Sequence, residues 1–342
     1  MKQDQRKTLT IAIPTYNGGD SLYDAVKSCI DANLPKDFLE ILVVDNCSSD
    51  DSITSLKSKF KDIDFLKIVK NKRNIGRIGN WNRCLKLAEG DFIMFIFSND
   101  LLSEDCNLLD AVNLLRKNKE CSLVHMPWVI SNYDMTNMSI CSQFYERTPM
   151  YGCHSAFLHV KKVVESGKLP LVPLQSNIFR SDILNRHNIL FNDSMPISAD
   201  GIFLSELALK SKNIAFFNSA SIIWRYDAPG RLHSSGIKMI EHMTQVIESF
   251  SIINNKSGNK IDLTKSIGNY GALEYVISAL INIKLENNFK HSKDFFFSYL
   301  LLAKKNRIIW FHFYMVQIWK FIKFPLKIKT LLLYYLKRNR MS

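Results

Sequence analysis

Short apolar runs alternate with amphipathic stretches over the first 127 residues of the chain. Each run is apolar on both sides of the pleat, as buried strands of a parallel sheet are. The runs cover residues 9–13, 41–44, 65–69, 92–97 and 122–126. The stretches between them space their apolar residues at three and four, which predicts helices over 22–32, 53–60, 78–88 and 108–117. This alternation predicts an α/β fold with a mostly parallel sheet flanked by helices.

The pattern is weaker in the second part of the chain. Residues 131–175 scatter proline and glycine among short apolar pieces, which indicates loops with an irregular strand or two. Periodicity then returns between residues 175 and 225. It predicts a short strand, a helix near 180–187, a helix near 201–210 and a strand near 214–224.

Positive charge is concentrated at the C-terminal end. The formal net charge is +13, and residues 290–342 hold twelve Lys or Arg against one acid, Asp294. Aromatic residues alternate there with lysines, and Lys320, Lys323 and Lys327 share a helix face. A basic, aromatic-rich helix beside a nearly neutral body favours an anionic membrane surface over nucleic acid as the partner. Packing of these helices on the α/β domain or on a partner is the alternative.

We therefore expect two regions. The α/β domain is predicted to cover residues 1–240, with halves at 1–127 and 128–240. A helical C-terminal region is predicted over 241–342, and its part from 290 to 342 is expected to associate with a membrane.

The rest of the composition points to the cytoplasm. The N-terminal residues MKQDQRK carry no apolar run, so no secretory signal is expected. The seven cysteines are odd in number and show no CxxC spacing, which argues against a disulfide framework or a zinc module. The longest late apolar stretch, residues 308–319, is shorter than the roughly 20 residues that span a bilayer. We expect a peripheral protein on the inner face of the membrane.

Candidate chemistry follows three of the predicted strands. The first strand ends in Pro14-Thr15-Tyr16 and a glycine-containing turn, the second in Asp45-Asn46, and the fourth in Ser98-Asn99-Asp100. Ligands of open α/β sheets bind beyond the carboxyl ends of the strands. The polar residues after any one of these strands could also simply form a turn or cap a helix. An acid directly after a strongly apolar run is nevertheless costly unless a cation, a donor or water satisfies it, and a nucleotide diphosphate with a divalent metal would do so.

Four segments of the chain, in the same order and spacing, resemble family-two glycosyltransferases of the GT-A fold. They are TIAIPTYNGGDSL, EILVVDNCSSD, NKRNIGRIGNWNRCLKLAEGDFIMFIFSNDLL and SNIFRSDIL…SADGIFLSELAL, within residues 8–235. The resemblance implies that Pro14, Thr15, Tyr16 and Asp45 hold the nucleotide. Asn80, Arg77 and Arg83 lie at the start of a predicted helix, near the expected diphosphate.

The resemblance also implies a divalent cation, Mn²⁺ or Mg²⁺, at Asp100, the acid of the DXD-type segment. The family usually places acids at two positions of this segment, whereas this chain has Ser98 and Asn99 before Asp100. The cation could still be held by one carboxylate, phosphate oxygens, waters and the Asn99 carbonyl. Metal dependence is thereby left open.

Two later segments complete the expected site. Asp200 precedes the predicted helix of SADGIFLSELAL, where similar proteins carry the general base, although an acid there can also be a helix N-cap. Glu206 is the fallback. Residues 224–226 and 231–234 resemble the closing loop of the family, in which His233 is a candidate for metal or phosphate contact.

The resemblance implies an inverting transferase that moves a sugar from a nucleotide diphosphate, most simply a uridine one, to a hydroxyl of a glycan or polyprenyl-linked acceptor. Surface-polysaccharide assembly is the expected setting. The alternatives are a non-catalytic sugar-nucleotide binder, which Ser98 and Asn99 favour, and a membrane-docked scaffold. A nucleotidyltransferase fits less well, because no Gly-rich loop bearing Lys or Arg follows the first strand.

Overall fold

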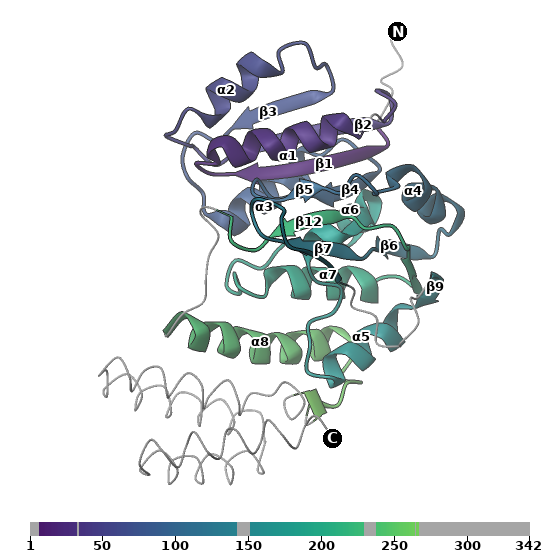
Figure 1. Ribbon diagram of the computed structural model, residues 1–342. Coiled ribbons are helices and arrows are strands. Elements are labelled where there is room, and N and C mark those ends of the chain that lie inside the picture. Colours follow the sequence, from purple (N-terminus) through teal and green to yellow (C-terminus); the bar gives the residue numbers. More distant parts are fainter. Residues whose placement is uncertain (1–6, 33, 142–150, 229–236, 264, 267–342) are drawn as a thin grey trace. The chain divides into compact units, whose positions relative to one another are not determined.

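The computed structural model describes residues 7–266, apart from 33, 142–150, 229–236 and 264 (Figure 1). The chain divides into one compact unit of residues 1–233 with 245–270, and a second of residues 234–244 with 271–342. Most of the second unit, including the basic segment 290–342, lies outside the described residues. The predicted domain boundary at residue 240 and the membrane-associating helix therefore stay predictions.

An eight-stranded sheet runs through the first unit, in the order β3-β2-β1-β4-β10-β6-β11-β9. Its strands are β1 (Leu9–Thr15), β2 (Leu39–Asp45), β3 (Leu66–Lys70), β4 (Phe92–Phe95), β6 (Cys121–His125), β9 (Gly152–Ser155), β10 (Asn177–Arg180) and β11 (Asn213–Phe216). The strands β3, β2, β1 and β4 are parallel, as is the pair β6 and β11, whereas β10 and β9 run antiparallel to their neighbours. The predicted α/β, mostly parallel GT-A architecture is confirmed.

Side chains that alternate along the central strands fill two cores. Leu9, Ile11 and Ile13 of β1 face one core, together with apolar residues of helices α1 (Gly19–Asp31), α2 (Ser52–Lys59) and α4 (Leu108–Lys117). On the other face, β4 contributes Phe95, which packs with Phe179 and Phe191. Helices α3 (Arg77–Leu87) and α7 (Ala199–Leu209) cover this aromatic core through Trp81 and Phe203. The parallel strands are thus buried on both faces, as their sequence predicts.

A second, four-stranded sheet lies beyond the end of β4, in the order β5-β12-β7-β8. Its strands are β5 (Leu101–Leu102), β7 (Trp128–Ser131), β8 (Met138–Cys141) and β12 (Ile222–Arg225). The chain enters it directly after Asp100 and returns to it from β11. Residues that follow β4 and residues that end β12 are therefore neighbours, although they are far apart in the sequence.

Two predictions for the second part of the chain are wrong in detail. The single strand expected near 214–224 is two strands, β11 and β12, which belong to different sheets. The region 131–175, expected to be loops with a strand or two, also contains helix α5 (Ala156–Glu165), whose first turn is capped by the Ser155 side chain accepting from the Leu158 N–H. The remaining helices are α6 (Ser181–His187) and α8 (Ile237–Lys256), with a short 3₁₀ turn, η1, at Leu174–Ser176.

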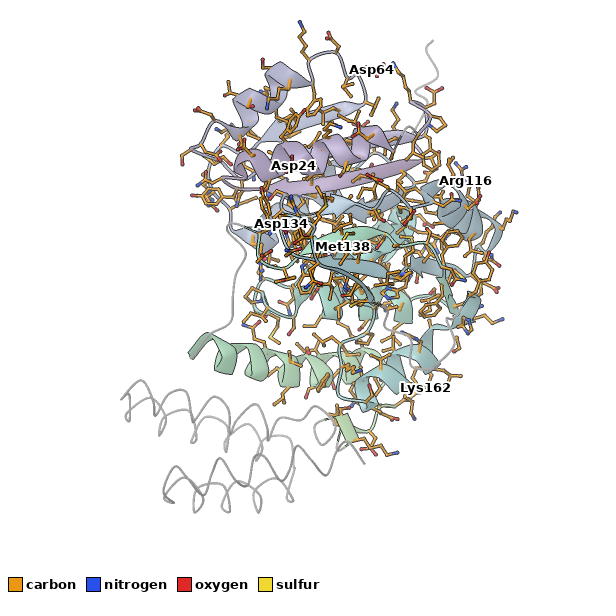
Figure 2. All side chains as sticks on the ribbon, viewed as in Figure 1. Asp24, Asp64, Arg116, Asp134, Met138 and Lys162 are labelled. Carbon is orange, nitrogen blue, oxygen red and sulfur yellow. The ribbon has the colours of Figure 1, made fainter. Side chains whose placement is uncertain are left out.

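Many charged side chains lie at the periphery, as Asp64, Arg116 and Lys162 do in Figure 2, but Glu40, Asp45, Asp100 and Arg225 are buried. In the part of the chain that the structure describes, we find no helix with both the length and the apolar character needed to cross a bilayer.

Candidate functional site

A cavity of about 560 Å³ opens at the carboxyl ends of the parallel strands. Residues from four chain segments line it: Pro14, Thr15, Tyr16, Asn17, Gly18, Ser21, Asn46, Asn74, Gly76, Arg77, Asn80, Trp81, Phe97, Ser98 and Asn99. Its volume is that of a small-molecule site. Of the predicted nucleotide-binding residues, Pro14, Thr15, Tyr16, Asn80 and Asn99 line this cavity. Asp45, Asp100 and Asp200 are not among the lining residues.

The turn after β1 presents an aromatic face to the cavity. Tyr16 is 52% exposed, so its ring is available for stacking on a planar group. Asn17 has a positive φ of 51°, and its side chain accepts a hydrogen bond from the Ser49 N–H. Gly18 is required by close packing, since a Cβ there would lie 2.6 Å from the Thr15 Oγ1. The turn is thereby fixed against the loop after β2.

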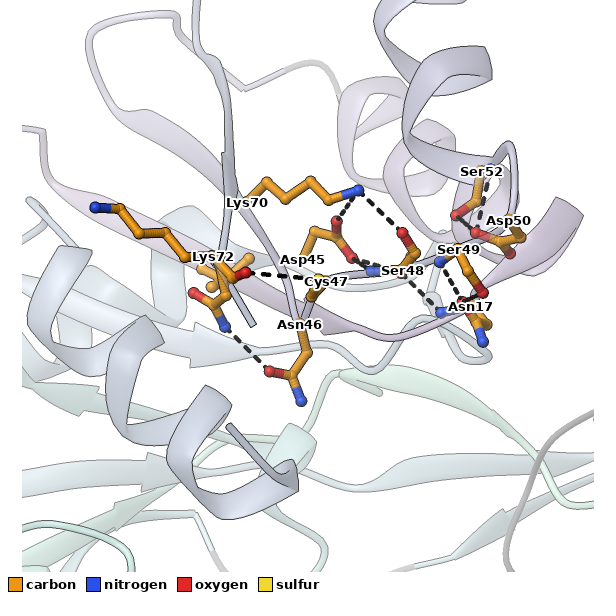
Figure 3. A network of polar contacts seen from close by, with 12 residues as sticks. Asn17, Asp45, Asn46, Cys47, Ser48, Ser49, Asp50, Ser52, Lys70 and Lys72 are labelled. Carbon is orange, nitrogen blue, oxygen red and sulfur yellow. Dashed lines mark hydrogen bonds and ion pairs between the residues drawn. The ribbon is translucent and has the colours of Figure 1, made fainter. Parts of the chain in front are cut away.

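Asp45 at the end of β2 is fully buried and stabilises the loop that follows β2 (Figure 3). Its carboxylate accepts hydrogen bonds from the N–H and hydroxyl of Ser48, and Lys70 lies 3.7 Å away. The next residue, Asn46, lines the cavity instead. Only the Oδ1 of Asp45 accepts the bonds from Ser48, and its buried Oδ2 has no hydrogen-bond donor among the described residues, so nucleotide contact by Asp45 stays a prediction.

Asparagine side chains build the floor of the cavity. Asn46 donates to the Asn74 side chain at 2.8 Å and accepts from the Ile75 N–H at 2.9 Å. Asn71 donates to both Asn46 and Asn80. Asn80 in turn donates to the Val44 carbonyl at 2.9 Å, which ties α3 to β2. Because the side-chain amide of Asn80 is engaged in these hydrogen bonds within the protein, Asn80 holds the cavity wall in place.

The N-terminus of α3 forms one side of the cavity. Gly76 precedes the helix with a φ of 78°, and Arg77 is its first residue. The guanidinium of Arg77 lies 5.2 Å from the centre of the Trp81 ring and donates to the Pro196 carbonyl. Trp81 itself stacks on Phe97 at 4.9 Å. A helix N-terminus beside an arginine attracts anions, and phosphate is a suitable ligand for such a place.

The end of β4 forms the opposite side. Ser98 and Asn99 are half-buried and line the cavity, whereas Asp100 is fully buried. The carboxylate of Asp100 accepts from the Gln175 side chain at 2.8 Å and from the Arg225 N–H at 3.2 Å. Asp100 therefore joins the end of β4 to η1 and β12.

Arg225 lies behind this strand end and is 3% exposed. Its Nε donates to the Asn99 carbonyl at 2.8 Å, and the guanidinium lies 4.6 Å from the centre of the Tyr133 ring. Asp24 of α1 is 3.4 Å from its Nη1. Sequence reasoning singles out Arg225 only as part of the segment 224–226.

Asp200 lies in the first turn of α7, where Ser198 occupies the N-cap position, so the predicted helix begins slightly earlier than expected. Its carboxylate accepts from the N–H of the adjacent Gly201. Burial raises the pKa of Asp200 above its usual range, and the positive charge of Arg77 opposes this rise. A carboxylate with a raised pKa beside a ligand cavity is a good candidate for a proton acceptor.

The other predicted groups lie elsewhere. Glu206, the fallback base, lies further along α7 and pairs with Lys256 at 2.6 Å. His233 and the segment 231–234 lie outside the described residues. The lining residues that sequence reasoning missed include Asn17, Ser21, Asn74 and Gly76. Only their position in the sequence, directly after β1 and β3, could have indicated that they line the cavity.

The comparisons with known proteins agree with this arrangement. The model of the family described as "Glycosyl transferase family 2" matches residues 10–159, which hold all four cavity-lining segments. Residues 10–159 belong to glycosyl transferase family 2. The resemblance seen in the sequence is thus confirmed.

The chain is 22% identical over 245 residues to the poly(ribitol-phosphate) beta-N-acetylglucosaminyltransferase TarS of Staphylococcus aureus. This match covers 71% of the chain but only 40% of that relative. A solved structure of S. aureus TarS 1-349 in complex with UDP-GlcNAc has a TM-score of 0.62 and 18% identity, and the match covers 84% of this chain and 80% of that one. At this identity, the match to the solved structure shows that the two chains share a fold.

A mannosyltransferase from Pyrobaculum calidifontis, solved in complex with GDP-Man and Mn2+, shares the fold with a TM-score of 0.52 and 18% identity, over 87% of this chain and 81% of that one. Of the expected metal ligands, Asp100 does not face the cavity, and His233 lies outside the described residues. Asp100 has both carboxylate oxygens engaged and is buried, and the cavity receives the neutral Asn99. Among the described residues, His, Cys, Asp and Glu nowhere gather in a group of three that could hold a metal.

Proposed function

We propose that this protein is an inverting glycosyltransferase that moves a sugar from a uridine diphosphate sugar to a hydroxyl group of a glycan or lipid-linked acceptor. The observation that carries the proposal is the cavity at the ends of β1, β2 and β4 within the family 2 domain. It combines an exposed tyrosine ring, a floor of asparagines and a cationic helix N-terminus. These groups suit a base, a ribose and a diphosphate respectively.

Each part of the donor has a proposed place. Tyr16 stacks on the base, because its ring is the exposed aromatic surface of the turn after β1. Arg77 and the first N–H groups of α3 bind the diphosphate and stabilise the charge that develops on it as it leaves. The choice of uridine follows the fold neighbour that holds UDP-GlcNAc.

Asp200 is the proposed general base. Direct attack of an acceptor hydroxyl on the anomeric carbon inverts its configuration and requires one group that takes the hydroxyl proton. The raised pKa of Asp200 makes its carboxylate a stronger base than an exposed one. Its proximity to Arg77 places it near the diphosphate end of the donor, where the sugar begins.

The acceptor is proposed from relatives. The relative TarS carries a name that specifies poly(ribitol phosphate), and ribitol units carry free hydroxyl groups. We propose an acceptor of this general kind, and assembly at the inner face of the membrane. The residues expected to bind that membrane, 290–342, lie outside the described part of the chain.

The test is a thermal-shift panel of UDP-, GDP- and CDP-sugars, followed by measurement of nucleotide release with poly(ribitol phosphate) or a polyprenyl-linked oligosaccharide as acceptor. We expect UDP-sugars to raise the melting temperature and acceptor to stimulate UDP release. Stabilisation without transfer to any acceptor would favour the non-catalytic binder. Stabilisation by no nucleotide would contradict the proposed donor site and favour a scaffold.

A further inference from the structure

The end of β4 presents no carboxylate to the cavity. Ser98 and Asn99 line it, and the oxygens that they offer are a hydroxyl and an amide carbonyl. Protein sites for Mg²⁺ and Mn²⁺ normally include at least one carboxylate, because its negative charge offsets the cost of removing water from the ion. The side chains at this strand end are therefore poor ligands for a divalent cation.

The carboxylate nearest to them is already engaged. Asp100 accepts from Gln175 and from the Arg225 N–H, residues 75 and 125 positions away in the sequence. To reach the cavity it would have to leave both donors unsatisfied in a buried environment. Its exposed fraction of 0% agrees with a structural role.

A cation is already fixed at the same strand end. The Arg225 guanidinium donates to the Asn99 carbonyl, and among the described residues its buried Nη2 has no hydrogen-bond acceptor. Since Arg225 is 3% exposed, water screens its charge only weakly. Asp24 pairs with Nη1 at 3.4 Å, and the charge of Arg225 also offsets part of the field of Asp100, which would otherwise attract a metal ion.

The opposite wall supplies a second fixed cation. Arg77 lines the cavity at the N-terminus of α3, and its position is set by Trp81 and by the Pro196 carbonyl. An arginine in a set orientation can bind two phosphate oxygens at once. The diphosphate would therefore lie beside the Arg77 guanidinium and the N-terminus of α3, with Arg225 buried behind the opposite strand end.

We propose that this chain binds the diphosphate of its donor without a divalent cation, with Arg77 and the α3 N-terminus in place of the metal. The inference rests on the proposed function, because it concerns the same donor site. It assigns Ser98 and Asn99 as the place where this chain lacks an acid that the resemblance would imply.

The experiment is calorimetric titration of the full chain with UDP, in EDTA and in Mn²⁺. For the wild type we expect affinities equal to within about twofold in the two buffers. Arg77→Gln should weaken binding about tenfold or more in both buffers, since it removes a charged hydrogen bond to phosphate. Arg73→Gln is the matched control, because Arg73 lies in the same loop without lining the cavity, and we expect less than a twofold change.

Asn99→Asp provides the converse test. A carboxylate at this position should create a metal site, so that Mn²⁺ raises UDP affinity about tenfold or more in the variant. Loss of the free Mn²⁺ electron paramagnetic resonance signal in the ternary mixture, beyond that caused by UDP alone, should appear in the variant and not in the wild type.

Two results would overturn the inference in distinguishable ways. If Mn²⁺ raises the affinity of the wild type more than about tenfold, the diphosphate is bound through metal, and the proposed function stands while this inference falls. If UDP binds in neither buffer and no other nucleotide does, the proposed function itself fails, and the inference with it.

Discussion

The ends of β2 and β4 carry the same pair of residue types and use them differently. Each has an aspartate beside an asparagine, Asp45-Asn46 and Asn99-Asp100, at the end of an apolar strand. In both pairs the aspartate is fully buried and the asparagine lines the cavity. In both places the aspartate holds the end of the strand in position through buried hydrogen bonds. The neighbouring asparagine lines the cavity.

The two acids differ in what they fix. Asp45 binds Ser48, three positions later, and shapes its own loop. Asp100 binds Gln175 and Arg225, from η1 and β12, and so joins the main sheet to the second one. Asp200 is a third case, since it lies beside Arg77 and has a raised pKa. The comparison separates a local, a long-range and a chemical role for three aspartates, and each can be tested.

The largest effect is expected for Asp200→Asn. The variant lacks the proton acceptor, so acceptor-dependent UDP release should fall about 100-fold or more. In the wild type the rate should rise with pH through the raised pKa of Asp200, because only the carboxylate can accept a proton. The exposed Asp193→Asn, in the same segment, is the control and should change the rate less than about twofold.

Stability gives a second readout for Asp200. Its folded pKa lies above the unfolded value, so its contribution to stability is present below the unfolded pKa and is lost as pH rises through the raised folded pKa. Asp200→Asn should therefore reduce this pH-dependent loss in urea denaturation. A variant that is inactive and also strongly destabilised at neutral pH would indicate a structural role instead.

Asp100→Ala should cost the most stability, about 3 kcal/mol, because it leaves the donors of Gln175 and Arg225 unsatisfied inside the protein. Urea denaturation followed by circular dichroism measures this. Asp105→Ala, an exposed acid on the same connection, should cost less than about 0.5 kcal/mol. Unchanged stability for Asp100→Ala would contradict its role as the tie between the two sheets.

Asp45→Ala should cost less, about 1–2 kcal/mol, since it removes hydrogen bonds within one loop. It should also weaken UDP binding indirectly, because the loop it shapes carries Asn46. The free energy of unfolding and the UDP affinity can be measured on the same sample. A cost larger than that of Asp100→Ala would reverse the proposed distinction.

Lys70→Ala should have the smallest effect, below about 1 kcal/mol. Its side chain is 51% exposed, and its amine lies 3.7 Å from the Asp45 carboxylate, so solvent screens the pair. The difference in unfolding free energy between low and high salt should shrink in the variant. A larger loss would mean that Asp45 depends on this cation more than on Ser48.

Much of the first half could be predicted because its elements are set by local periodicity. The strands β1 to β4 and the helices between them read directly as apolar runs and amphipathic stretches, and the cavity follows from where parallel strands end. The second half depends on long-range pairing. Residues 213–225 look like one apolar strand, and only the pairing of β11 with β6 and of β12 with β7 divides them.

The site was predictable to the level of segments, and less so to the level of side chains. Tyr16 and Asn99 line the cavity as expected, but Asp45 and Asp100 turn inward because partners for them exist at Ser48, Gln175 and Arg225. No spacing in the sequence reveals these partners. The direction of a single side chain at a strand end depends on what the rest of the fold brings beside it.

Photolabelling of the full chain with 5-azido-UDP, followed by mass spectrometry of its peptides, tests the donor site most directly. The account predicts labels in peptides that contain residues 14–18 or 46, with labelling suppressed by excess UDP. Labels outside the cavity-lining segments, or labelling that UDP does not suppress, would contradict it.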